Sequence, residues 1–192
     1  FIAQTRAYTV QDHVAEVQQD VRGAMEIMVR DIRMAGYQGR GFGNATIEDS
    51  PIVTPLSNNS ITVNYERNSI LTTVTYALMG TDLRRTVGGV QETLLNGVTA
   101  LDFSYGIDAD GDRVIDGIDG ETGMIPDSAF RTAAFVNGLP AVPVPPRVFS
   151  VRIFLTANPG SPDPDVTKVV SPRTLTSVVT PRNMFLSRLW EY

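Results

Sequence analysis

The sequence predicts a single domain of the α+β class, in which one long N-terminal helix packs on an antiparallel β-sheet. A chain of 192 residues with 42% hydrophobic composition is long enough for one well-packed core. Its apolar residues follow a helical period at the start of the chain and alternate with a period of two from near residue 60. This single switch of period separates one helical segment from a run of strands, a pattern typical of an α+β fold.

The helix is predicted over residues 1–36 by the spacing of its apolar positions. They recur three or four residues apart, which places them on one stripe, while charged residues such as Glu26 and Arg30 fall elsewhere on the helix surface. The helix is expected to end where Gly36 can take the left-handed conformation of a C-terminal cap. The stripe, which is the candidate packing face, consists of Val10, Val14, Val17, Val21, Met25, Met28 and Ile32.

After a connection over residues 37–60, the chain is predicted to form antiparallel strands. Apolar and polar residues alternate in these segments, and a Gly-containing turn at 79–81 suits a hairpin. Residues 61–107 are expected to form one continuous meander, and residues 148–192 to add the C-terminal strands. The predicted strands are 60–66, 72–78, 82–87, 91–98, 100–107, 148–157 and 173–183.

Residues 108–147 are predicted to be an acidic and Pro-rich insertion within the same domain. Strand signals are weak in this segment, which also contains five prolines between positions 126 and 146. An irregular segment of this length is uncommon inside a compact domain and is typical of recognition loops or ion sites.

Charge and composition argue against several classes of function. The net charge of −5 offers no electrostatic attraction to nucleic acid or to an anionic membrane surface. The absence of cysteine excludes disulfides, thiolate metal sites and a cysteine nucleophile. His13 is the only histidine and falls on the predicted helix, so a cluster of histidine metal ligands cannot form. We therefore predict a protein that is not an enzyme and has no catalytic residues.

The segment DADGDRVIDGID, residues 108–119, is a candidate calcium loop. An EF-hand-type loop supplies oxygen ligands from positions 1, 3, 5, 7, 9 and 12, with position 7 acting through its backbone carbonyl. Arg113 occupies position 6, where glycine normally allows the sharp turn, at a cost of about 1 kcal/mol. Calcium binding and a solvated acidic turn both remain open. The candidate ligands are Asp108, Asp110, Asp112, Val114, Asp116 and Asp119.

Several segments, taken in order, resemble minor type IV pilins of the PilW kind. The helix ends in MVRDIRMAGYQG, of which the RMAGY part is the most specific. The middle has YALMGTDLRRTVGGVQETLLNGVTALDFSYGIDADGD, and the end has VFSVRIFLTANP followed by RTLTSVVTPRN. The resemblance covers most of the chain except residues 37–60 and 120–146. It implies a pilin-like fold.

The resemblance also implies a non-enzymatic subunit that takes part in the initiation and assembly of a type IV pilus, at or near the filament tip. The stripe from Val10 to Ile32 would then pack partly on its own sheet and partly on neighbouring subunits. Other minor pilins and the major pilin are the expected partners in a hetero-oligomeric filament, and no nucleic acid is expected.

Such subunits are made as prepilins with a leader and an apolar N-terminal stretch. Phe1 is therefore expected to fall part-way along the long helix, and the cleavage and methylation residues of the family have no counterpart in this chain. Before assembly the subunit is expected to be anchored in the inner membrane through the preceding segment, with its domain in the periplasm. After assembly it is expected in an extracellular filament.

Three alternatives stay open beside the pilus. The J-type pseudopilin of type II secretion shares the helix, the sheet and a similar C-terminus, although RDIRMAGY resembles the pilus branch more closely. A calcium-dependent extracellular adhesion module would make the acidic loop its central feature. An exported hydrolase would need a catalytic pair that converges in a pocket.

Overall fold

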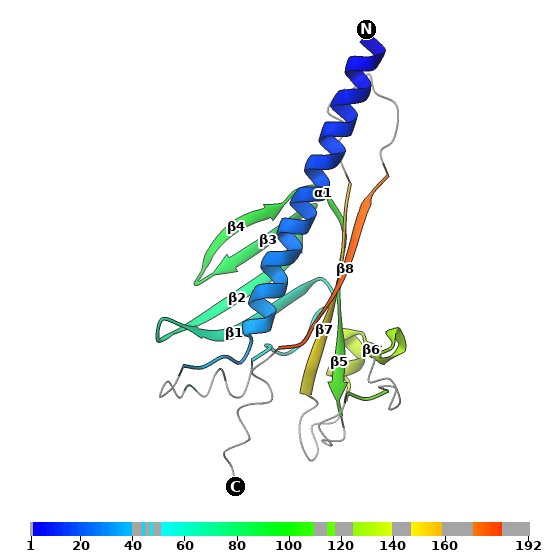
Figure 1. Ribbon diagram of the computed structural model, residues 1–192. Helices are drawn as coiled ribbons and strands as arrows, with labels where there is room; N and C mark the ends of the chain where they lie inside the picture. Colours follow the sequence, from blue (N-terminus) through cyan, green and yellow to red (C-terminus); the bar gives the residue numbers. More distant parts are fainter. Residues whose placement is uncertain are drawn as a thin grey trace.

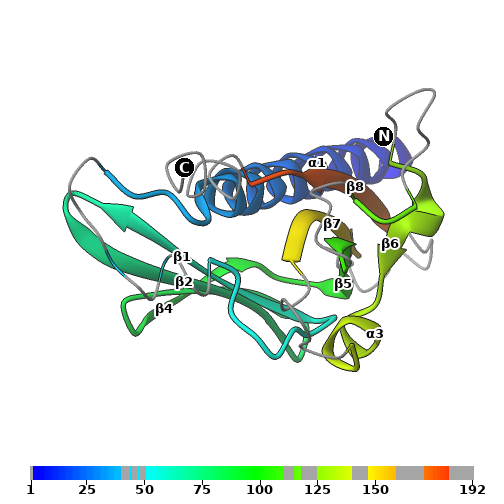
Figure 2. The same ribbon diagram turned by 90° about the horizontal axis from the view of Figure 1, so that it is seen from below.

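The structure of the protein, a computed structural model, describes residues 2–39, 44, 47, 51–109, 115–117, 125–139, 147–158 and 171–181. Within them, one N-terminal helix packs against two antiparallel β-sheets, and the arrangement is pilin-like. In Figure 1 the helix runs past both sheets, and in Figure 2 it lies along one side of them. The α+β class predicted from the periods is confirmed.

Helix α1 spans Ile2–Met34, and only its C-terminal part lies against the sheets. It contacts strands of both sheets, so a single helix contributes to a core shared by the two. The predicted cap is present, because Gly36 has φ of 79° and its amide donates to the carbonyl of Asn64 at 2.9 Å. No helix in the described part of the chain has an apolar stretch long enough to cross a membrane.

The first sheet is a four-stranded antiparallel meander. It contains β1 (Ser60–Arg67), β2 (Ile70–Met79), β3 (Asp82–Val87) and β4 (Val90–Leu95) in that order. The predicted strands 60–66, 72–78 and 82–87 are confirmed, and the turn between β2 and β3 uses Gly80 at φ of 65°. The predicted strand 91–98 is too long, because β4 ends at Leu95 and Val98 already belongs to the other sheet. Side chains of Val63, Val74 and Leu83 are fully buried on the face that meets the helix.

The free edge of β1 is covered by the chain that follows α1. The amide of Glu66 donates to the carbonyl of Tyr37 at 2.8 Å, and the amide of Val53 donates to the carbonyl of Thr62 at 2.9 Å. The described part of the predicted 37–60 connection therefore protects a sheet edge that would otherwise be open to pairing with another chain.

The second sheet joins segments that are far apart in sequence. Its order is β6 (Phe130–Arg131), β5 (Val98–Asp108), β7 (Arg147–Ala157) and β8 (Arg173–Val179). The prediction that the meander continues from β4 into β5 is therefore wrong. At the junction Gly97 has φ of 70°, and the amide of Asn158 donates to its carbonyl at 2.8 Å, so that β5 begins beside the end of β7.

The described part of the 108–147 segment contains regular structure that its composition does not predict. It contains a 3₁₀ turn η1 (Asp127–Ala129), strand β6, and a short helix α3 (Ala133–Asn137). Thr132 caps α3, since its hydroxyl accepts from the amide of Phe135 at 3.3 Å. Ala133 and Val136 of α3 are buried in the core. These tertiary contacts stabilise a helix that is too short to be stable by itself.

Candidate functional site

The helix stripe predicted for packing is divided between two environments. Its C-terminal members Val21, Met25, Met28 and Ile32 are 1%, 6%, 0% and 0% exposed, so they belong to the core of this domain. Val14 and Val17 are only half-buried, and the side chain of Val10 lies outside the described residues. Val17 packs against the core cluster, so Val14 is the one stripe residue with a described side chain that lies outside this cluster.

A buried carboxylate joins α1 to the first sheet. Asp31 is 3% exposed and lies beside Ile32 in the helix. Its Oδ2 accepts from the Tyr76 hydroxyl at 2.6 Å and from Nη2 and Nε of Arg85 at 2.9 and 3.1 Å. The Tyr65 hydroxyl donates to Oδ1 at 3.4 Å. We call these four residues, Asp31, Tyr65, Tyr76 and Arg85, the Asp31 cluster.

The Asp31 cluster compensates the cost of burying charge. The guanidinium of Arg85 also donates from Nη1 to Glu92 at 2.9 Å, so both ends of the fork have a carboxylate partner. Burial raises the pKa of Tyr76, and the hydrogen bond to Asp31 raises it further, so the phenol stays protonated and remains a donor. Through these satisfied side chains the ion pair links α1 to β2 and β3.

Asp31 and Arg85 were not among the residues predicted from the sequence, although both carry a signal. Asp31 interrupts an apolar stripe, and a charged residue beside Ile32 needs a partner wherever that face is buried. In β3, residues 83, 85 and 87 lie on one face, so Arg85 shares the inward face of Leu83. That the two charges meet is seen only from how α1 packs on β3 in the structure.

The acidic loop is described at its two ends. Asp108 is the last residue of β5 and is 2% exposed. The amide of Asp116 donates to the carbonyl of Ile107 at 2.7 Å, and the amide of Ala109 donates to Oδ2 of Asp116 at 3.1 Å. The chain therefore folds back on itself, and positions 1 and 9 of the predicted calcium loop lie close together.

The remaining candidate ligands, Asp110, Asp112, Val114 and Asp119, lie outside the described residues. Among the described residues, no group of three or more acidic or histidine side chains is placed to hold a metal ion. The side chain of His13 also lies outside the described part of the chain. Calcium binding thus stays a prediction, as does the absence of enzymatic activity.

Calcium is expected to raise the melting temperature if residues 108–119 bind it. Binding to the native state alone stabilises by RT ln(1 + [Ca²⁺]/Kd), which is about 2.7 kcal/mol when the concentration is 100 times Kd. The measurement compares melting in several millimolar calcium with melting in chelator, and Asp110→Ala is the variant that should lose the shift. Asp82→Ala removes an aspartate from β3 and serves as the control. Identical melting curves with and without calcium would leave residues 108–119 as an acidic turn.

No model of a known protein family matches this chain, and no curated protein matches it either.

Proposed function

We propose that this protein is a non-enzymatic minor pilin subunit that takes part in the initiation and assembly of a type IV pilus, at or near the filament tip. The observation that carries the proposal is the course of α1. Its C-terminal part packs across two antiparallel sheets in a pilin-like arrangement, and its N-terminal part extends beyond them (Figure 1). The sheets do not cover the N-terminal part of the helix, so other subunits can pack on it.

The segment that carries the family resemblance supports the proposal through its role in the fold. Within RDIRMAGY, Asp31 binds Arg85 of β3 and Gly36 provides the left-handed cap. Tyr37 then accepts a backbone hydrogen bond from Glu66 of β1. The motif thus sets how the end of the long helix joins the first sheet, which is a task that every subunit built on this plan has to perform.

The proposed partners are the other minor pilins and the major pilin. In this proposal Val14, which is half-buried and lies outside the core cluster, faces neighbouring helices, whereas Val17, Met28 and Ile32 serve the core of the domain. The subunit would be anchored in the inner membrane before assembly, with the domain in the periplasm, and would lie in an extracellular filament afterwards.

The test is co-purification with the minor pilins encoded by the same organism, together with a count of surface pili after complementation. Val14→Arg is expected to abolish partner binding and piliation, because it places a charge on the helix face that meets a neighbour. Gln19→Arg puts the same charge at an exposed position of α1 and is the matched control. The free energy of unfolding of both variants should stay within about 0.5 kcal/mol of wild type.

Other outcomes identify the alternatives. Binding to pseudopilins of a type II secretion system, with no effect on pili, would replace the pilus by a secretion pseudopilus. Ligand binding that chelator abolishes, without any pilin partner, would favour a calcium-dependent adhesion module. A wild-type protein that binds no minor pilin at high concentration would refute the proposal.

A further inference from the structure

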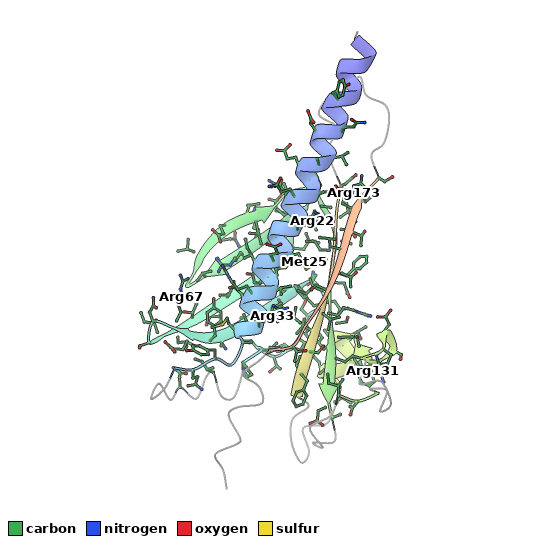
Figure 3. The ribbon with its side chains drawn as sticks, in the orientation of Figure 1. Arg22, Met25, Arg33, Arg67, Arg131 and Arg173 are labelled. Atoms are coloured by element: carbon green, nitrogen blue, oxygen red, sulfur yellow. The ribbon has the colours of Figure 1, made fainter. Side chains whose placement is uncertain are left out.

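An open groove of about 590 Å³ runs along the side of α1, between the helix and β8. Its lining combines apolar side chains with two arginines and one glutamate of α1, and a serine of β8 lines it as well. Figure 3 labels two of the lining side chains, Met25 and Arg33, on α1. The lining residues that matter for the argument are Met25, Val29, Arg30, Arg33, Tyr37 and Ser177.

The groove lies where the described chain stops. Strand β8 runs alongside α1 and ends near the C-terminal end of the helix, as both ribbon views show (Figures 1 and 2). Ser177 lines the groove, and Pro181, four residues later, is buried and is the last described residue. The chain therefore leaves the described part of the domain close to one end of the groove.

The sequence after Pro181 has the composition of a segment that needs an apolar surface. Six of the nine residues from 184 to 192 are apolar. Phe185 with Leu189, and Leu186 with Trp190, are four apart, so apolar residues recur with the spacing of one helix face. Arg188 and Glu191 supply one charge of each sign, and the groove likewise presents Glu26 beside Arg30 and Arg33.

We propose that residues 184–192 of the same chain bind along this groove, with Trp190 against its apolar lining residues Met25 and Val29. From Met25 to Arg33 the helix rises about 12 Å, and eleven residues after Pro181 can span up to about 36 Å, so the segment is long enough to enter the groove from its near end. Attachment through a few residues gives an effective concentration in the millimolar range, so even a weak contact is occupied.

The experiment uses Trp190, the only tryptophan of the chain, as the reporter in the intact protein. Acrylamide quenching of its fluorescence is expected to be several-fold weaker in the native protein than in urea, and its native emission should be shifted to the blue. Tyr37→Ala and Arg33→Glu, which alter the groove, are each expected to increase quenching and shift the emission to the red.

Each variant has a matched control on the same helix. Tyr8→Ala removes a tyrosine that is 67% exposed, and Arg22→Glu reverses an exposed arginine outside the groove. Both should leave Trp190 as protected as in wild type, and circular dichroism checks that all four variants are folded. Arg33→Glu keeps the test valid should Tyr37→Ala fail to fold.

Three results would overturn the proposal. Equal quenching in the native and unfolded protein would mean that Trp190 is exposed to solvent in the native protein and does not bind the groove. Protection that both groove variants leave unchanged would place Trp190 elsewhere on the domain. Protection that grows with protein concentration would make a second copy supply the segment. The inference concerns two parts of one chain, so its failure would leave the proposed pilus function standing, and the reverse also holds.

Discussion

Replacing Asp31 by alanine is expected to lower the free energy of unfolding by about 3–5 kcal/mol, the range found when one partner of a buried ion pair is removed. The substitution leaves the guanidinium of Arg85, which is 13% exposed, without the buried one of its two carboxylate partners. It also removes the closer of the two acceptors of the Tyr76 hydroxyl, at 2.6 Å, and leaves the Ile27 carbonyl at 3.4 Å. For a domain of this size the loss corresponds to a fall of about 6–20 °C in melting temperature.

The matched control is Asp20→Ala, which removes the same side chain from an exposed position of α1. Its effect should stay within about 0.5 kcal/mol, because a surface carboxylate with water around it contributes little. Urea denaturation of both variants measures the difference. Equal stability of the two variants would show that the Asp31 cluster does not hold the helix on the sheet.

A double-mutant cycle then assigns the loss to a pair. Once Asp31 is gone, replacing Arg85 by methionine should be stabilising, since it removes a buried cation that has lost a partner and leaves an unbranched apolar chain of similar length. If the Arg85→Met substitution has the same effect in both backgrounds, the cost of Asp31→Ala comes from Tyr76 and Tyr65 instead.

The elements of the fold with a strong period were predictable from sequence. The stripe of α1 and the alternation in β1, β2, β3, β7 and β8 each depend on neighbours a few residues away. The pairing of β5 was not predictable, because strand alternation is the same whether β5 pairs with β4 or with β7. That choice depends on Gly97 and Asn158, which are 61 residues apart in the chain.

The candidate site, too, could be predicted from the sequence only in part. The period of α1 identifies the stripe, yet it cannot say where along the stripe the domain ends and an outside surface begins. Likewise, the charges of Asp31 and Arg85 are plain in the sequence, while their contact depends on how the helix is rotated on β3. Short elements such as α3 are missed because five residues hold too little of any period, and tertiary burial of Ala133 and Val136 supplies their stability.

Replacing Met28 by alanine tests where the stripe becomes part of the core, and it is expected to cost about 2–5 kcal/mol. Met28 is 0% exposed and packs in the core cluster with residues of both sheets, so truncation leaves a cavity that neither sheet can close without moving the helix. The measurement is again the free energy of unfolding in urea.

Met79→Ala is the control, because the same side chain is 49% exposed at the end of β2 and its truncation should change stability by at most about 0.5 kcal/mol. Val14→Ala should also cost well under the Met28 value, since Val14 is only half-buried and no cavity forms inside the domain. A cost at Val14 as large as that at Met28 would mean that the whole stripe serves the monomer. In that case no part of it would be left for a neighbouring subunit, and the proposed filament contact would have to use another face.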